Sequence, residues 1–341
     1  MQMNFTLAPK KELKTLIAPF LIPITRAGVR YGRGPTQRAL WNTVGRRIQS
    51  RYHPFDVKTR FGFRFAGNTE DLVASYIYYF GIWEPAITEW ICSLPLLGRT
   101  VVDVGAHYGW YSLLGARCVG KTGRVIAIEA SPTTFGCLRH NIAINSETNI
   151  RLVNAAAWNS TKELRLFLGP KDNTGITTVV SEFSGLTQRA RSQTSAISVQ
   201  AAPISMLLRP EEVATTGLVK IDVEGAEQEV AEGLEPLLAH FPEDVLFILE
   251  VTPQVLGGSN RTVEELLRIF TDRGFVPYVI RNEYKPEFYF ECIECGYPRP
   301  VELQAPITKQ ADIILSRVQL GCMARNRCGG AASAADTADC N

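Results

Sequence analysis

The sequence predicts an α/β fold in which helices cover both faces of a mostly parallel sheet. Short apolar runs alternate with segments of helical periodicity, a pattern typical of strands joined by crossover helices. The first of these runs ends at an acid and then two glycines, Asp103, Gly105 and Gly109, which indicates a ligand pocket at the strand end. The 341 residues, 45% hydrophobic and 21% charged, suffice for one large core with terminal additions.

The elements are expected in a regular order along the chain. Two helices, 70–80 and 88–97, precede the sheet. The strands follow at 100–105, 124–129, 150–156, 217–222 and 245–251, with helices between them. The segment 157–216 is too long for a plain connection, and its alternating pieces 163–168 and 196–201 predict a β-rich insertion after the third strand. Residues 173–178 are expected to form a loop over the pocket. The insertion either selects the substrate as a lid or extends the sheet without touching the substrate.

The turn after the first strand is the clearest sign of a bound cofactor. Gly105 and Gly109 let the backbone turn sharply and approach a ligand closely before the helix 110–118. The next strand ends in Glu129, near the offset at which Rossmann-type domains place a carboxylate to accept hydrogen bonds from both ribose hydroxyls. Together these elements are expected to form one half of a binding crevice.

Two classes of cofactor compete for this crevice. A dinucleotide needs three glycines so that its pyrophosphate can lie against bare backbone, and His107 occupies the middle glycine position. S-adenosylmethionine has no phosphate, so the spacing favours it; a dinucleotide, or glycines that serve packing alone, are the alternatives. The predicted cofactor-binding residues are Asp103, Gly105, Ala106, His107, Gly109, Glu129, Ala130, Ala155, Ala156 and Asp222.

A later apolar strand, within 217–227, also ends in acids at the entry to a helix. Because ligands of open α/β sheets bind outside the carboxyl ends of the strands, Asp222 and Glu224 are expected to face the same crevice. Alternatively, these acids cap the helix that follows. For Glu227, capping and a place in the crevice are equally good explanations. A weakly nucleophilic alcohol needs a base to take its proton. The candidates for this base are Asp222 and Glu224, then Glu250 at the end of the next strand, then His107.

These motifs and their order resemble the FkbM-type S-adenosylmethionine-dependent methyltransferases. The matching stretches are Val-Val-Asp-Val-Gly-Ala at 101–106 with Gly109 and Ser112, Ile-Glu-Ala-x-Pro at 128–132 with Asn141 and Asn145, Asn-Thr-Gly-Ile at 173–176, Lys-Ile-Asp-Val-Glu-Gly-Ala-Glu at 220–227 and the lead-in Trp-Glu-Pro at 83–85. The resemblance implies a class I methyltransferase (Rossmann-like) fold, S-adenosyl-L-methionine as methyl donor, and O-methylation of a hydroxyl on a saccharide, glycolipid or polyketide-like metabolite. The chain departs from the family at His107, where Asn is usual, and at 203–205, which replaces a stretch that commonly contains Leu-Asp.

Other classes of function have weaker support. Amino-methylating enzymes of nucleic acids carry an Asn/Asp-Pro-Pro-aromatic element after the fourth strand, and cytosine-C5 chemistry needs a cysteine near Asp222; this chain has neither. An NAD-type oxidoreductase on a similar fold and a non-enzymatic scaffold are the remaining alternatives. No metal is expected, although Cys292, Cys295, Cys322 and Cys328 could in principle close a zinc site. Three further cysteines, Cys92, Cys118 and Cys137, are expected to be buried thiols.

The two ends of the chain differ from its middle. We expect a basic N-terminal extension at 1–65, a methyltransferase domain at 66–317 and a disordered tail at 318–341. Residues 1–60 hold 12 Lys or Arg against two acids, a local charge of +10. Such an extension could contact an anionic membrane, a nucleic acid or a charged substrate, or it could pack on the domain as a solvated addition. No 18-residue apolar run exists, so a cytoplasmic protein without a spanning helix is expected.

Overall fold

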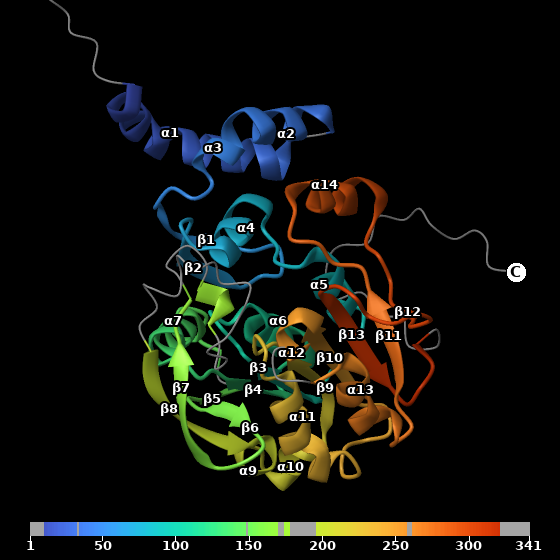
Figure 1. Cartoon of the computed structure of the whole chain (residues 1–341). Coiled ribbons are helices and arrows are strands. Elements are labelled where there is room, and N and C mark those ends of the chain that lie inside the picture. The colour runs from blue at the N-terminus through green and yellow to red at the C-terminus, as the bar shows by residue number, and fades with distance from the viewer. Residues whose placement is uncertain are drawn as a thin grey trace, which may run out of the picture.

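A computed structural model describes residues 10–32, 34–147, 149–169, 174–177, 196–257 and 261–320 of the chain. Its centre is an eight-stranded sheet in the order β12-β11-β13-β10-β9-β3-β4-β5 (Figure 1). The bounds are β3 Thr100–Val104, β4 Arg124–Ile128, β5 Ile150–Val153, β9 Thr216–Ile221, β10 Leu246–Val251, β11 Val276–Ile280, β12 Val301–Glu302 and β13 Ala311–Ser316. The strands from β10 to β5 run parallel, whereas β13, β11 and β12 add an antiparallel end. The predicted α/β fold with a mostly parallel sheet is confirmed.

Helices cover both faces of this sheet because successive residues of each buried strand point to opposite sides. In β3, Val101 belongs to one apolar core, which α6 (Trp110–Val119) shares. Val102 and Val104 belong to the other core, which α11 (Glu227–Leu234) and α13 (Val263–Thr271) share. The remaining described helices of the domain are α4 Leu72–Phe80, α5 Pro85–Cys92, α7 Pro132–Ala143, α9 Ile204–Leu207, α10 Pro210–Val213, α12 Pro253–Gly257, α14 Pro286–Cys295 and the 3₁₀ turns η2 Thr174–Ile176 and η3 Glu235–Leu237.

The predicted insertion is a small separate sheet in the order β6-β8-β7, formed by β6 Ala156–Trp158, β7 Lys162–Phe167 and β8 Ala196–Pro203. The single strand predicted at 150–156 therefore divides in two. The break falls at Asn154, whose side-chain amide donates to the backbone carbonyls of Glu129 and Ala130 at 2.8 and 3.2 Å. This side chain replaces the strand ladder at the bend and directs the chain into the second sheet.

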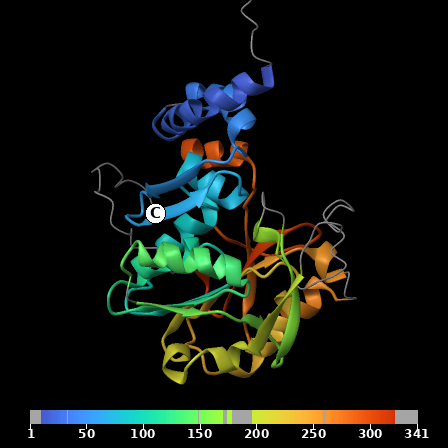
Figure 2. The ribbon, with the colours of Figure 1, turned by 90° about the vertical axis from the view of Figure 1, so that its left-hand side faces the viewer.

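The first part of the chain forms a helical layer above the domain, followed by a hairpin (Figures 1 and 2). Its elements are α1 Lys10–Tyr31, α2 Pro35–Leu40, the π-helical turn η1 Trp41–Gly45, α3 Arg46–Ile48, and the strands β1 Pro54–Lys58 and β2 Arg64–Asn68. Trp41 is fully buried, and Arg38 donates to Glu294 of α14 with two nitrogens at 3.0 and 2.8 Å. The layer therefore packs on the domain, and the division expected at residue 65 falls within β2.

Some sequence expectations need correction. Asp71 caps α4, which begins at Leu72 because the Asp71 carboxylate accepts a hydrogen bond from the Ala74 amide at 3.0 Å. The next helix, α5, is Pro85–Cys92 rather than 88–97, since a proline at its first position favours the earlier start. Cys92 and Cys118 are buried as expected, but Cys137 is exposed on the outer side of α7. The end of the predicted tail, including Cys322 and Cys328, lies outside the described residues, among which no helix is long and apolar enough to span a membrane.

Helix α11 packs so closely on β6 that it tolerates only glycine at one position. A Cβ added at Gly233 would lie 2.0 Å from the carbonyl oxygen of Trp158, whereas one added at Gly136 in α7 would meet nothing within 4 Å. We predict that Gly233→Ala lowers the free energy of unfolding by about 2 kcal/mol or more. The matched change Gly136→Ala should raise it by about 0.5–1 kcal/mol, because alanine favours the helix. Urea denaturation of both variants measures this, and equal effects would contradict the close packing of α11.

Candidate active site

A cavity of about 320 Å³ opens at the carboxyl ends of β3, β4, β9 and β10. Each of these strands contributes the residue just after it or at its end: Gly105, Glu129, Asp222 and Glu250. The structure thereby brings together residues from distant parts of the chain. The predicted site residues that line this cavity are Gly105, His107, Glu129, Ala130, Ala155, Ala156, Asp222, Glu224 and Glu250.

Three predicted cofactor-binding residues do not line the cavity. The carboxylate of Asp103 lies behind the wall and accepts a hydrogen bond from the Ser112 hydroxyl at 2.5 Å. Burial raises the pKa of Asp103 to about 6, although the Ser112 hydroxyl opposes this shift. Ala106 is buried in the core, and Gly109 precedes α6 in a left-handed conformation with φ 91°. These residues shape the turn from within the protein, and their part in cofactor binding stays a prediction.

The turn at Gly105 requires glycine because of the neighbouring strand. Gly105 has φ 80°, and a Cβ there would lie 1.8 Å from the carbonyl oxygen of Asp222. The amide of Asp222 in turn donates to the Val104 carbonyl at 3.0 Å, so this turn and the end of β9 are locked together. The sequence analysis expected a ligand to approach this glycine. In the structure, the closest approach comes from the protein's own backbone.

Glu129 presents the carboxylate best placed to bind a ribose. Its Oε2 accepts from the backbone amide of His107 at 2.9 Å, and its Oε1 accepts from that of Ser131 at 2.8 Å. Burial raises the pKa of Glu129 to about 7, although these two amides lower it. Each oxygen keeps a further lone pair for a ligand hydroxyl. With Ile128, Ala130 and 155–157 as an apolar wall beside it, this part of the cavity fits the ribose and the adenine ring of S-adenosylmethionine.

His107 is engaged by the loop that covers the cavity. Its Nε2 lies 2.9 Å from the hydroxyl of Thr174, and its ring stacks on Tyr108 with the centroids 4.0 Å apart. The same Thr174 hydroxyl donates to Asp71 at 2.7 Å. Burial lowers the pKa of His107, which favours the neutral imidazole. The described part of the loop, 174–177, contributes Thr174, Gly175 and Thr177 to the cavity wall, while Asn173 and 178–195 lie outside the described residues.

A buried lysine, Lys220 in β9, holds Asp222 at the other side of the cavity. Its Nζ donates to Asp222 Oδ2 at 2.7 Å and lies 4.6 Å from the ring centroid of Tyr111, and the residue is only 3% exposed. Burial disfavours its charge, but the charges of Asp222, Glu84 and Glu250 outweigh this effect and raise the pKa of Lys220. Lys220 was not among the site residues predicted from the sequence. A cation within an otherwise apolar strand was the feature that could have identified it.

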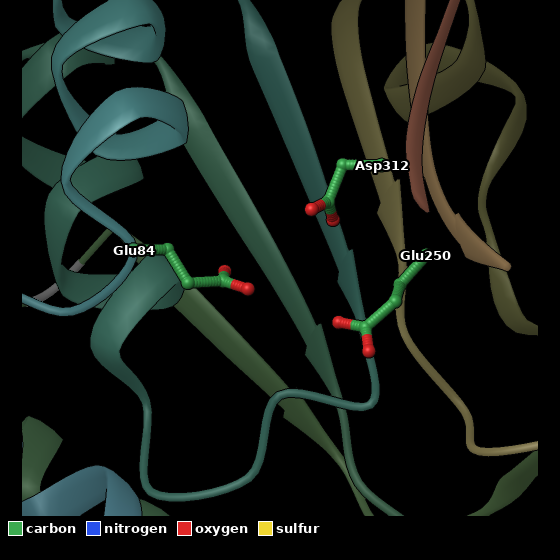
Figure 3. A group of neighbouring side chains, drawn as sticks. All are labelled: Glu84, Glu250 and Asp312. Carbon is green, nitrogen blue, oxygen red and sulfur yellow. The ribbon is translucent and has the colours of Figure 1, made fainter. Parts of the chain in front are cut away.

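Three carboxyl groups, from Glu84, Glu250 and Asp312, form a buried cluster beside this lysine (Figure 3). Neutral donors connect them. The Tyr284 hydroxyl lies 2.6 Å from Glu84 and 2.7 Å from Glu250, and the Asn282 amide nitrogen lies 3.0 Å from Glu84 and 3.1 Å from Asp312. Burial and then the neighbouring acids raise the pKa of both Glu250 and Asp312 well above their usual values. Hydrogen bonds from these neutral donors lower the cost of burying the cluster.

The acids could also hold a divalent cation. Two groups, Glu84 with Glu250 and Asp312, and Asp222 with Glu224 and Glu250, each offer three carboxylate oxygens within 4.8 Å of one another. Oxygen ligands of this kind suit Mg²⁺ or Ca²⁺. In the first group, the carboxylates already accept hydrogen bonds from the side chains of Tyr111, Tyr284, Asn282 and Gln310. One buried oxygen, Asp312 Oδ1, has no hydrogen-bond partner among the described residues. The expectation of no metal stays a prediction.

Glu224 and Glu227 follow Asp222 but have different surroundings. Glu224 lines the cavity in a left-handed backbone conformation with φ 47°. Burial, followed by the charges of Asp222 and Glu227, raises the pKa of Glu224 to about 8. Glu227 does not line the cavity; its Oε1 accepts a hydrogen bond from the Gly225 amide at 2.8 Å at the start of α11. Glu227 is the first residue of α11, and its hydrogen bond fixes the turn that leads into this helix.

Comparison with known proteins supports one family. The Methyltransferase FkbM domain matches residues 103–277, just over half of the chain. No curated protein matches the sequence. Among solved structures, the methyltransferase FkbM of Methylobacillus flagellatus KT is 14% identical with a TM-score of 0.35, and the match covers 72% of this chain and 55% of that chain. The precorrin-6y C5,15-methyltransferase of Geobacter metallireducens is 14% identical with a TM-score of 0.36, and the match covers 68% of this chain and 85% of that chain. The fibrillarin of Aeropyrum pernix in complex with S-adenosylmethionine is 12% identical with a TM-score of 0.36, and the match covers 77% of this chain and 93% of that chain. At such TM-scores these likenesses carry no argument, and the domain match alone establishes the family.

The raised pKa of Glu224 makes the stability of the protein depend on pH. The group keeps its proton in the folded chain up to about pH 8, whereas the ordinary value is 4.5. Between these values the folded state binds more protons, so stability falls as pH rises through this window. We predict that Glu224→Gln removes part of this fall. Its melting temperature should gain about 3 °C or more relative to the unchanged protein between about pH 5 and pH 9.

The matched control is Glu163→Gln in β7, which removes an exposed carboxylate away from the cavity. It should leave the dependence of the melting temperature on pH unchanged. Parallel pH profiles of the unchanged protein and Glu224→Gln would show that Glu224 ionises as an ordinary surface acid.

Proposed function

Because the chain belongs to the FkbM family of S-adenosylmethionine-dependent methyltransferases, we propose that it methylates a hydroxyl oxygen of a saccharide, glycolipid or polyketide-like metabolite. One observation carries this proposal. Asp222 lines the same cavity as Glu129, so a proton acceptor is available near the carboxylate suited to a ribose. An alcohol reacts as a nucleophile only if its proton is taken as the new bond forms, and a carboxylate at this place supplies that acceptor.

The side of the cavity near β4 would bind the methyl donor. Glu129 accepts hydrogen bonds from the two ribose hydroxyls, and the wall formed by Ile128, Ala130 and 155–157 packs against the adenine ring. S-adenosylmethionine, when bound, supplies an electrophilic methyl group on a positively charged sulfur. Carboxylates around the cavity favour a positively charged donor over a neutral one, because opposite charges attract strongly in a partly buried site.

The side near β9 and β10 would bind the acceptor. Asp222 takes the hydroxyl proton, and the ion pair with Lys220 holds its carboxylate at the cavity wall in one orientation. Glu224, whose pKa burial raises to about 8, carries a proton at neutral pH and can donate a hydrogen bond to a neighbouring oxygen of the acceptor. Burial also raises the pKa of Glu250. An acceptor rich in hydroxyl groups satisfies this mixture of donors and acceptors.

The alternatives fit this charge pattern poorly. A nucleic acid and a nicotinamide dinucleotide both carry phosphates, and among the described residues the cavity wall offers acids and no Lys or Arg to bind them. His107 also fills the position at which a pyrophosphate needs bare backbone. No observation favours a second function over O-methylation.

We predict that two substitutions separate the two sides of the cavity. Asp222→Asn should reduce methyl transfer by about 10²-fold or more and keep the affinity for S-adenosylmethionine, because it removes the proton acceptor. Glu129→Ala should instead weaken S-adenosylmethionine binding, because it removes the hydrogen bonds to the ribose. Calorimetry measures binding, and transfer of a labelled methyl group to a panel of saccharides, glycolipids and hydroxylated polyketides measures activity.

Two results would count against the proposal. Loss of S-adenosylmethionine binding in Asp222→Asn would assign Asp222 to the donor, as the sequence analysis also allowed. Label that enters RNA or DNA and none of the hydroxylated compounds would overturn the acceptor class. Binding of NAD instead of S-adenosylmethionine would overturn the transfer reaction itself.

A further inference from the structure

The outer face of α1 is an exposed apolar stripe. Phe20, Ile24 and Tyr31 are 73%, 63% and 72% exposed, and Pro23 and Ala27 between them are exposed as well. Steps of three and four residues place all five on one side of a helix. Large apolar side chains in such a row mark a surface that contacts something else.

The inner face of the same helix is also apolar. Ile22 and Val29 are almost fully buried in the core that the layer shares with the domain, and Thr25 lies between them. Helix α1 is therefore apolar on both sides, which is unusual for a helix that faces water. The inner side explains how α1 attaches to the domain. The outer side has no role in that attachment.

The part of the chain that contains this stripe is strongly basic. No Asp or Glu lies between Glu12 and Asp56, whereas this interval contains Lys14, Arg26, Arg30, Arg33, Arg38, Arg46, Arg47 and Arg51. Two of these arginines are paired with α14, Arg38 with Glu294 and Arg46 with Glu287. The exposed Arg47 and Arg51 have no carboxylate partner among the described residues. An apolar row on a basic helical layer suits a partner that is both apolar and anionic.

The layer lies at one end of the molecule. Figures 1 and 2 show α1 to α3 beyond α4 and α14, at the end opposite α9 and α10. The stripe can therefore meet an extended flat surface without interference from the domain. Prolines at 19 and 23 and the cation Arg26 make α1 unsuited to cross a bilayer, which agrees with the lack of a spanning helix among the described residues.

We propose that the outer face of α1 binds the surface of an anionic lipid bilayer. Phe20, Ile24 and Tyr31 enter the boundary between headgroups and acyl chains, with the helix in the plane of the membrane. The arginines and lysines of the layer attract the anionic headgroups. A second copy of the chain fits this face less well, because two like-charged layers would repel each other. The inference does not depend on the proposed methylation.

The test uses the full chain and vesicles of phosphatidylcholine with or without phosphatidylglycerol. We expect the unchanged protein to sediment with the anionic vesicles and to be released as salt rises, because salt screens the attraction. The double variant Phe20→Ser/Ile24→Ser should bind about tenfold or more weakly, because it removes two apolar side chains from the stripe. The control Leu97→Ser/Val301→Ser removes two side chains that are 77% and 62% exposed elsewhere, and it should bind as the unchanged protein does.

Thermal melting verifies that both double variants are folded, and light scattering measures their oligomeric state. No binding of the unchanged protein to either vesicle would overturn the proposal. Equal binding by the stripe variant and the control would also overturn it, because the stripe would then have no part in binding. A dimer that only the stripe variant loses would assign the face to a second copy instead.

Discussion

The site depends on one buried positive charge among several buried acids. Lys220 lies in the middle strand of the sheet, and its ammonium group faces Asp222, Glu84 and Glu250. Burying an unpaired charge is costly, and neither the lysine nor the acids could occupy this place alone. The lysine balances one carboxylate through a direct ion pair. The neutral donors Tyr284 and Asn282 stabilise Glu250 and Asp312 by hydrogen bonds, and burial raises the pKa of both acids.

This balance gives the two sides of the cavity different properties. Near β4, Glu129 is held by backbone amides, which fix its position without adding charge. On the side near β9 and β10, the acids include Glu84 before α5 and Asp312 in β13, and the Asn282 side chain donates a hydrogen bond to each of these two. The arrangement near β4 suits a ligand that a whole family shares. The arrangement near β9 and β10 can change with substitutions at a few positions, so it can adapt to different acceptors.

The sequence predicted the parallel half of the sheet because β3, β4, β9 and β10 are continuous apolar runs that end in acids or glycine. It did not predict β11 and β13, whose antiparallel pairing with each other and with β10 is set by contacts made only in the folded chain. It correctly predicted that Glu129 and Asp222 lie at the same edge of the sheet, because the carboxyl ends of parallel strands meet at one edge. It could not show that Asp103 points behind the cavity wall toward Ser112. Nor could it join Glu84 to Asn282, 198 positions later in the chain.

The most direct test of this account is a double-mutant cycle between Lys220 and Asp222, read from urea unfolding at neutral pH. Lys220→Met and Asp222→Asn, singly and together, remove the charges and keep most of the side-chain volume. If the ion pair stabilises this edge of the sheet, the loss in the double variant will be smaller than the sum of the single losses, by about 1–3 kcal/mol. Losses that add to within about 0.5 kcal/mol would contradict the account.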